Sequence, residues 1–475
     1  MAVRMHVDGD DDRGIPAGRE GAGGGHALFT DLYELTMLQA YVEEGMTDTA
    51  VFSLFVRRLP ARRNVLLACG LEAVLDYLSN LRFDDGEIAY LASLGRFSER
   101  FLAWLRDFRF EGDVHAVPEG TPVFPNEPIL EVVAPLPQAQ LVETFVMNQI
   151  HLQTVLASKA LRVVSAAKGR PVIDFGARRM QGIDAAMKGV RALYIGGVAA
   201  TSNVAAGRRY GIPVSGTMAH SYIQAHGEEA TAFRAFADLY PETVLLVDTY
   251  DTIKGVRNVV DLARTLGDRF RVRAVRLDSG DLSLLAREAR RILDEAGLRR
   301  VGIFASGGLD EDSIDALVSS GAPIDAFGVG TSMGVSDDVP ALDIAYKLCE
   351  YAGRGCVKLS PGKPVFPGRK QIFRQDEGGE DVRDVIGRTG EALPGRPLLL
   401  PVMRNGRRLP VGDVDLRAAR DYAQRQVARL PERVRGLAQA DPPYPVDISP
   451  ALSHFQEAAV REAGDGEGRG PAAAR

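Results

Sequence analysis

Residues 272–331 read VRAVRLDSGDLSLLAREARRILDEAGLRRVGIFASGGLDEDSIDALVSSGAPIDAFGVGT, and this segment gives the clearest indication of the architecture. Three short apolar runs alternate here with two stretches whose apolar residues recur at helical spacing. The runs lie at 272–277, 301–305 and 324–329, and the helical stretches at 282–296 and 311–319. Alternating strands and helices imply parallel strands joined by right-handed crossovers. We therefore expect an α/β fold, either a barrel or an open doubly wound sheet.

Three further apolar runs precede this segment and extend the pattern. They are Val172–Ile173, Ile212–Val214 and Val244–Val247. Polar or ionisable residues follow every run, namely Asp174 to Arg179, Thr217 and His220, Asp248 to Thr252, Arg276 to Asp281, Ser306 to Asp310, and Gly328 to Thr331. In α/β barrels the active site forms at this carboxyl end of the strands. The clustering predicts a catalytic barrel.

The pattern of apolar residues changes near residue 150, which indicates two domains. Helical patterns between 27 and 145 surround a strand candidate at 50–56 and a β-rich segment at 114–133, which predicts an α+β domain. A helical stretch at 139–167 leads into the barrel, placed at 146–349. The ends, residues 1–26 and 461–475, are rich in glycine and charge, and we expect disordered tails there.

Composition excludes several classes of protein. A chain of 475 residues with 45% hydrophobic residues can bury a large core. No apolar run is long enough for a membrane span and no signal peptide is evident, which predicts a cytoplasmic protein without a membrane partner. Three scattered cysteines argue against a disulfide framework or a zinc site. A net charge of −6 without charge blocks argues against nucleic-acid binding, so small molecules are the expected partners.

Glycine-rich loops and one histidine suggest binding of phosphate. Loops 306–308 and 328–331 suit phosphate cradles, because glycine lets backbone N–H groups approach an anion and Thr331 adds a hydroxyl donor. His220 stands between small residues, which keep its imidazole reachable, and its commonest role would be that of a general base.

Acidic and basic residues complete the predicted site. Asp248 and Asp278 could hold Mg²⁺ or bind sugar hydroxyls, whereas Asp281 is placed to cap the following helix. Three arginines, Arg178, Arg179 and Arg276, present donor forks that suit a carboxylate or phosphate. These residues point to an anionic, phosphate-bearing substrate, but they do not name the reaction.

Six motifs in order resemble the nicotinate phosphoribosyltransferase family. They are Thr30 to Met37 (TDLYELTM), Phe175-Gly176-x-Arg178-Arg179, Gly196 to Asn203, Gly216 to Ser221 (GTMAHS), Val247 to Thr252 (VDTYDT) and Arg276 to Asp281 (RLDSGD). The resemblance runs from about Leu28 to Arg374.

The resemblance implies a reaction and an assembly. The family joins nicotinate to phosphoribosyl pyrophosphate with coupled ATP hydrolysis and Mg²⁺, giving nicotinate mononucleotide and pyrophosphate, a reaction of the ligase class. It implies an irregular, incomplete α/β barrel and a second α+β domain built from N-terminal and C-terminal segments. Residues 350–455 would complete the domain at 27–145, and the segment 350–460 would pack on it. The family works as a homodimer with shared active sites.

The resemblance also assigns roles to individual residues. Phe175 and the partner subunit's Tyr33 would stack on the pyridine ring, with Arg276, Thr217 and Arg178 near its carboxylate. Asp278 would face the ribose or its Mg²⁺, and His220 would take a phosphoryl group from ATP. The phosphates of the second substrate would meet Ser306, Gly307, Gly308, Gly328, Gly330 and Thr331, although many relatives carry an aspartate where Gly308 stands.

Two alternatives to a nicotinate enzyme stay open. The relative that uses nicotinamide has an aspartate at the position of Ser202, where a carboxylate would repel nicotinate and a hydroxyl can donate to it. Ser202 therefore favours the acid as substrate. A non-catalytic relative that binds nucleotide precursors would keep the loops but lose a reactive group. Tyr33, His220, Arg276 and Asp278 are all present, which favours an enzyme.

Overall fold

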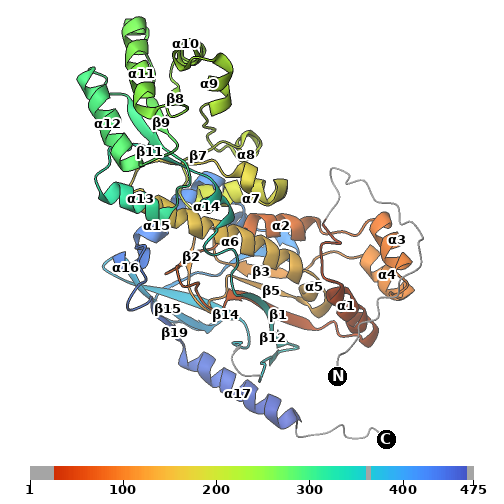
Figure 1. Ribbon diagram of the computed structural model, residues 1–475. Coiled ribbons are helices and arrows are strands. Elements are labelled where there is room, and N and C mark those ends of the chain that lie inside the picture. The colour runs from red at the N-terminus through yellow and green to blue at the C-terminus, as the bar shows by residue number, and fades with distance from the viewer. Residues whose placement is uncertain (1–25, 360–364, 468–475) are drawn as a thin grey trace, which may run out of the picture.

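The computed structural model describes residues 26–359 and 365–467, and it consists of two domains joined by one long helix (Figure 1). Residues 1–25 of the expected N-terminal tail and 468–475 of the expected C-terminal tail lie outside the described residues. No helix within the described ranges has the length and apolar character needed to cross a membrane.

Six parallel strands form the curled sheet of the first domain, in the order β7-β6-β11-β10-β9-β8. The bounds are β6 Val172–Asp174, β7 Ala200–Thr201, β8 Val244–Leu246, β9 Ala274–Leu277, β10 Gly302–Ala305 and β11 Ala326–Val329. In the described chain β7 and β8 form the two edges of the sheet, so the barrel is incomplete. The prediction of an irregular α/β barrel is confirmed.

Helices follow these strands after short loops. Their bounds are α7 Gly182–Ile195, α8 Val204–Tyr210, α9 His220–His226, α10 Glu229–Leu239, α11 Thr252–Leu266, α12 Leu282–Glu295, α13 Glu311–Ser319 and α14 Thr331–Val335, with 3-10 turns η1 Ala177–Arg179 and η2 Gly267–Arg269. Asp251, Asp281 and Asp310 each accept a hydrogen bond from the backbone three residues later, which fixes where α11, α12 and α13 begin. The predicted capping role of Asp281 is confirmed.

One predicted strand of the barrel is wrong. The run Ile212–Val214 forms no strand, and Val214 makes only an isolated parallel bridge with Thr201. The strand next to β6 is instead β7, whose two residues are too few to show a pattern in the sequence. His220 therefore begins a helix after a loop and does not directly follow a strand.

The second domain contains an antiparallel seven-stranded sheet in the order β13-β12-β1-β5-β3-β17-β18. Its bounds are β1 Thr49–Val56, β3 Asp113–Ala116, β5 Leu130–Pro135, β12 Ile344–Tyr351, β13 Arg354–Gly355, β17 Leu400–Arg404 and β18 Arg407–Arg408. A four-stranded sheet, β16-β14-β15-β19, adds β14 Lys370–Glu377, β15 Glu380–Arg388, β16 Arg396–Pro397 and β19 Val446–Ile448. Strands from both ends of the chain thus build this domain, as the resemblance implied.

The remaining elements belong to this domain and to its border with the barrel. They are β2 Leu66–Leu67, β4 Pro122–Val123, α1 Leu32–Glu44, α2 Leu71–Asn80, α3 Asp85–Ser93, α4 Glu99–Arg106, α5 Leu136–Leu141, η3 Pro410–Gly412, α15 Leu416–Ala428, α16 Glu432–Arg435 and α17 Pro450–Glu467.

Two expected boundaries differ from the structure. The barrel was placed up to residue 349, but β12 begins at Ile344 and pairs with β1, so the chain has already entered the second domain there. The C-terminal tail was expected from residue 461, but α17 continues to Glu467.

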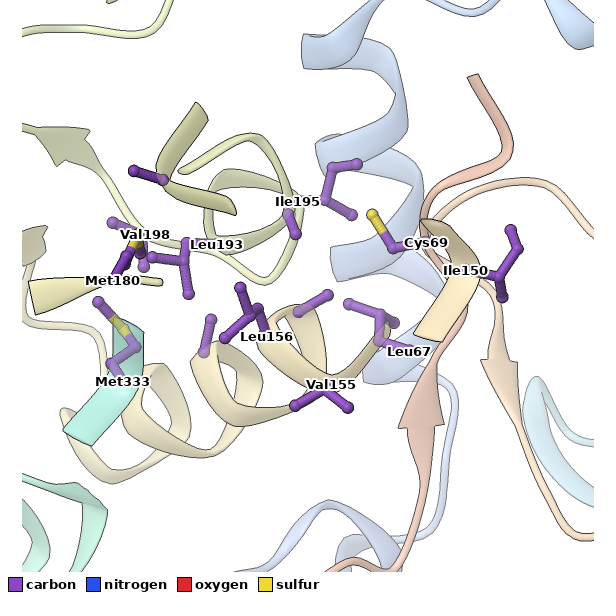
Figure 2. Packing of buried hydrophobic residues seen from close by; sticks show 14 of the residues in the cluster. Leu67, Cys69, Ile150, Val155, Leu156, Met180, Leu193, Ile195, Val198 and Met333 are labelled. Carbon is purple, nitrogen blue, oxygen red and sulfur yellow. The ribbon is translucent and has the colours of Figure 1, made fainter. Parts of the chain in front are cut away.

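Helix α6, Glu143–Ala166, joins the two domains. Residues 153–160 are buried without interruption, so more than two turns are enclosed on every side. Figure 2 shows its side chains in one cluster with both domains, including Ile150, Val155 and Leu156 of α6, Leu67 of β2, and Leu193 and Ile195 of α7. The position of the barrel relative to the second domain is therefore set by packing around α6.

Candidate active site

Arg276 on β9 lies at the centre of the polar cluster predicted at the carboxyl ends of the strands. Its Nε donates to Ser306 Oγ at 2.8 Å, its Nη1 to Thr217 Oγ1 at 2.7 Å, and its Nη2 to Asp278 Oδ1 at 2.9 Å. Only 14% of the side chain is exposed. One guanidinium thus connects the loops after β9 and β10 with the loop before α9, which keeps its charge in a fixed place.

An aromatic ring lies beside this guanidinium. The carbon at the centre of the Arg276 guanidinium is 5.5 Å from the centroid of the Phe175 ring, within reach of a cation–π attraction. A second aromatic ring, that of Phe304, has its centroid 5.9 Å from the centroid of the Phe175 ring. A flat substrate that carries an acid group would find a ring and a cation together here.

Gly328 supports the Phe175 ring from below. A Cβ atom at this position would stand 2.5 Å from the ring, which no real side chain tolerates. Gly328 is buried within β11, whereas Gly330 and Thr331 lie at the end of the strand. The close approach of the ring therefore accounts for glycine at 328, and the predicted phosphate contacts of all three residues stay predictions.

Asp174 holds two loops of the site in position. Its Oδ1 accepts from the backbone N–H of Gly176 at 2.8 Å and its Oδ2 from the Thr201 hydroxyl at 2.7 Å. The Asp174 carbonyl accepts from the backbone of Ser202 at 2.9 Å. Burial raises the pKa of Asp174, although the bonds from Thr201 and Gly176 oppose that rise. This carboxyl group ties the loop of Phe175 to the loop of Ser202, whose half-buried side chain lies beside it.

The two acids predicted to hold a metal lie next to each other. Asp248 Oδ2 accepts from the Asp278 backbone at 2.9 Å and from Ser279 Oγ at 2.7 Å. Asp248 Oδ1 is buried and has no hydrogen-bond partner in the described chain. Partial burial alone would raise the pKa of Asp278, but hydrogen bonds from Ser306 and Arg276 outweigh it and hold the pKa below its usual range. Asp278 is therefore a carboxylate at neutral pH.

His220 stands at the rim of the same cluster. Its Nδ1 is 3.1 Å from Thr249 Oγ1, and its Nε2 is 3.7 Å from Asp278 Oδ2. The side chain is 41% exposed. One ring nitrogen is thus held by a hydroxyl, while the other faces a carboxylate and solvent.

The loop after β10 depends on glycine. Gly307 has φ +92°, and a Cβ there would stand 1.8 Å from the Asp278 carbonyl oxygen. Ser306 is buried, while Gly307 and Gly308 are exposed. The backbone of Gly307 and Gly308 is therefore open to solvent, and a loop that binds phosphate needs this access.

Three predicted residues do not join the hydrogen-bonded cluster around Arg276. Tyr33 belongs to α1 and is 48% exposed, and α1 lies at the end of the molecule opposite the parallel sheet (Figure 1). Arg178 and Arg179 lie in the exposed turn η1 after β6, and neither side chain makes a hydrogen bond among the described residues. A ring from Tyr33 cannot stack on Phe175 of its own chain in this arrangement.

Sequence reasoning gave no role to three residues that shape the site. Asp174 and Thr201 form the bridge described above, and Thr249 contacts His220. Asp174 and Thr249 stand directly after predicted strands, so position alone was a signal for them. Thr201 had no signal from a predicted strand, because β7 was not predicted, and only the motif from Gly196 to Asn203 pointed to it.

Comparisons with known proteins agree over both domains. The chain matches the model of the nicotinate phosphoribosyltransferase N-terminal domain at residues 28–151 and that of the nicotinate phosphoribosyltransferase family at residues 171–362. It is 55% identical to the nicotinate phosphoribosyltransferase pncB2 of Mycobacterium tuberculosis, covering 94% of this chain and 93% of the relative. The Bacillus subtilis nicotinate phosphoribosyltransferase is 43% identical over 73% of each chain. The human nicotinic acid phosphoribosyltransferase structure superimposes with a TM-score of 0.80 at 28% identity, covering 90% of this chain and 99% of that one.

Replacing Gly328 by alanine tests the support of the aromatic ring. We expect Gly328→Ala to lower the free energy of unfolding by about 1–3 kcal/mol, because the added methyl group forces Phe175 out of place. Urea denaturation measures this change. Gly216→Ala is the matched control, since nothing lies within 4 Å of a Cβ there, and equal denaturation midpoints for the two variants would contradict the close contact.

Proposed function

This chain belongs to the nicotinate phosphoribosyltransferase family, and we propose which residues of its site perform each step of the family's reaction. The chain forms nicotinate mononucleotide and pyrophosphate from nicotinate and phosphoribosyl pyrophosphate, in NAD salvage from nicotinate. The contacts of Arg276 support this assignment of roles, because they join the aromatic ring of Phe175 to the carboxylate of Asp278.

Nicotinate binds against the face of Phe175, with its carboxylate toward Arg276. The ring of Phe175 stacks on the pyridine, and the Arg276 guanidinium attracts the carboxylate, with the Thr217 hydroxyl beside it. Arg178 is exposed and follows Phe175 closely in the sequence, so it adds positive charge at the entrance of the nicotinate site. With the carboxylate held at Arg276, the pyridine nitrogen is free to face the sugar.

The phosphoribosyl group lies over Asp278. Its bond from C1 to pyrophosphate breaks, positive charge grows on the sugar, and the pyridine nitrogen forms the new bond to C1. Asp278, kept ionised by Ser306 and Arg276, stabilises that charge. Backbone groups of loops 306–308 and 330–331 bind the phosphates.

The two carboxylates fit a Mg²⁺ ion that arrives with the pyrophosphate. Asp248 Oδ1 is buried without a partner, and Asp278 Oδ2 contacts only His220 at 3.7 Å among the described residues. No group of three or more potential ligands occurs in the described chain, which suits Mg²⁺, since it commonly uses one or two carboxylates together with substrate phosphates. The ion would neutralise the departing pyrophosphate.

His220 couples the reaction to ATP. Its ring accepts the γ-phosphoryl group while ADP leaves, and water later releases phosphate and restores the imidazole. The support is a half-exposed ring whose Nδ1 contacts Thr249 and whose Nε2 faces Asp278 beside the pyrophosphate position. A phosphohistidine there places new negative charge next to the leaving group, which changes the affinity of the site for pyrophosphate.

Two copies of the chain share their active sites. Leu32 and Tyr33 on α1 are 46% and 48% exposed, and Ile183 and Val204 beside the site are 86% and 71% exposed. Large apolar side chains at both places suit burial against a partner. Tyr33 of the partner subunit then closes the pyridine pocket opposite Phe175. A cytoplasmic location stays a prediction.

An assay with and without ATP tests the reaction and the role of His220. We expect nicotinate, phosphoribosyl pyrophosphate and Mg²⁺ to give the mononucleotide, and ATP to be hydrolysed in step with product. In His220→Ala, product forms without ATP hydrolysis, because the phosphoryl acceptor is missing. His226→Ala is the control, since this exposed residue of the same helix contacts the carbonyl and the ring of Tyr222 and lies outside the cluster around Arg276. Coupled ATP hydrolysis in His220→Ala would refute the phosphohistidine, and no product from nicotinate would refute the reaction.

Ser202 tests the choice between the acid and the amide. Ser202→Asp should lower the ratio of kcat/KM for nicotinate to that for nicotinamide at least about tenfold, roughly 1.4 kcal/mol, because the new carboxylate repels the acid and accepts from the amide. Ser202→Ala separates the loss of the hydroxyl from the gain of charge and should not gain nicotinamide activity. An unchanged ratio in Ser202→Asp would favour the alternative of a nicotinamide enzyme or another specificity residue.

Mixing two defective variants tests the shared site. Tyr33→Ala and Phe175→Ala should each lose most activity as pure proteins. After unfolding and refolding together in equal amounts, about a quarter of the wild-type activity should return, because a mixed dimer carries one site with neither defect. The separately refolded variants are the controls, and no recovery in a mixture that forms dimers would place Tyr33 outside the partner's site.

A further inference from the structure

A second pocket lies on the outside of the barrel, away from the site described above. It has a volume of about 250 Å³ and opens between α2 and α6 on one side and α7 and α8 on the other, four helices that pack side by side (Figure 1). None of its lining residues belongs to the cluster around Arg276. Arg209 and Tyr210 line it from the last turn of α8, whereas Ser202 precedes the first turn of that helix.

Aromatic rings form much of its wall. Tyr77 of α2 and Phe145 of α6 stack with ring centroids 3.8 Å apart and planes 9° apart, and Tyr210 and His26 add two more rings. An apolar cavity of about 150 Å³ holds a benzene ring, so this volume suits one ring and a substituent. Flat walls favour a planar guest over an extended aliphatic one.

The uncompensated charge of the pocket is positive. Its two acids are already paired, Glu72 with Arg191 at 2.5 Å and Asp76 with Arg408 at 2.8 Å. Arg209 is exposed and forms no ion pair with an acid of the described chain. Lys188 pairs only with Asp184, which is 73% exposed. An anionic guest would therefore gain a charged partner without displacing a buried ion pair.

Two buried lining residues also carry polar atoms without a partner. Tyr77 is 6% exposed and Gln153 is 1% exposed, and neither the Tyr77 hydroxyl nor the Gln153 Nε2 makes a hydrogen bond in the described chain. Gln153 Oε1 accepts from Arg191 Nη1 at 3.4 Å, which fixes the amide so that its N–H groups are the free ones. Unpaired buried donors are costly, so these two groups are unsatisfied polar atoms just beneath the surface of the pocket wall.

The geometry points to a second binding site in this pocket for a small planar aromatic carboxylate. The aromatic walls select a ring, the volume limits it to about one ring, and the exposed Arg209, which has no ion pair in the described chain, selects a carboxylate. The assignment rests on the pocket alone and holds whatever the catalytic site does.

Calorimetric titration of the full-length protein with benzoate tests this site. Benzoate has the ring and the carboxylate but no pyridine nitrogen to react. Because it would also bind beside Phe175 and Arg276, the variants of this pocket are compared in protein that carries Arg276→Gln. We expect Arg209→Gln to weaken benzoate binding about tenfold, the loss of one charge-assisted contact. Arg208→Gln, which removes a neighbouring exposed arginine outside the pocket, should bind benzoate as the wild type does. Ala73→Phe, which fills the pocket from α2, should abolish binding while the melting temperature confirms folding.

Two further measurements separate this site from the catalytic one and test the class of guest. Arg276→Gln should keep the binding that Ala73→Phe loses, and benzamide should bind at least about tenfold more weakly than benzoate. The proposal is overturned if benzoate does not bind, if binding is lost in Arg276→Gln and kept in Ala73→Phe, or if Arg209→Gln binds as tightly as Arg208→Gln. Equal binding of benzamide and benzoate would overturn the claim that the pocket selects a carboxylate.

Discussion

The ammonium group of Lys159, buried in the middle of α6, fixes how the two domains meet. It lies 2.6 Å from Glu311 Oε2 at the start of α13 and 2.9 Å from Asp338 Oδ1 beyond α14. Arg162 reaches the other oxygen of Glu311 at 2.9 Å, and Arg63 of the second domain lies 2.8 Å from Asp338. Charges buried at this depth are tolerated only when every partner is in place, so this network permits one arrangement of the surrounding helices and penalises others.

The ion pairs around Lys159 also fix the geometry of the active site. Glu311 follows the loop of Ser306 by a few residues, and Asp338 follows the loop that begins at Gly330, so two loops of the site end at residues bonded to α6. Burial alone would raise the pKa of Glu311, but Lys159 and Arg162 lower it and keep the group charged. With these ends held, Arg276 can bond to Ser306 on one loop and Thr217 on another without having to order them itself.

The repeating part of the fold could be predicted from the sequence, and the long-range pairings could not. Strands β8 to β11 and helices α12 and α13 follow from the period of their apolar residues. The pairing of β12 with β1 joins segments nearly 300 residues apart, and no local pattern carries that information. For the site, placement after strands was enough to group Asp248, Arg276, Asp278 and Ser306, because carboxyl ends of parallel strands meet at one edge. Glycine is needed at 328 because the ring of Phe175, in the loop after β6, lies against it, and only the folded chain reveals this contact.

The contacts around Asp278 connect Arg276 with His220. Asp278 uses Oδ1 for Arg276 and Ser306, and its Oδ2 faces the His220 ring at 3.7 Å. A change of charge on His220 therefore acts on Asp278 first, and through it on the guanidinium beside Phe175. At such short separations inside a partly buried site, charge interactions are stronger than at an exposed surface. With a phosphoryl group on His220, as proposed, any effect of that group on the affinity for an acid at Arg276 is matched by an equal effect of the acid on the phosphorylation equilibrium of His220, because coupling between two sites is reciprocal.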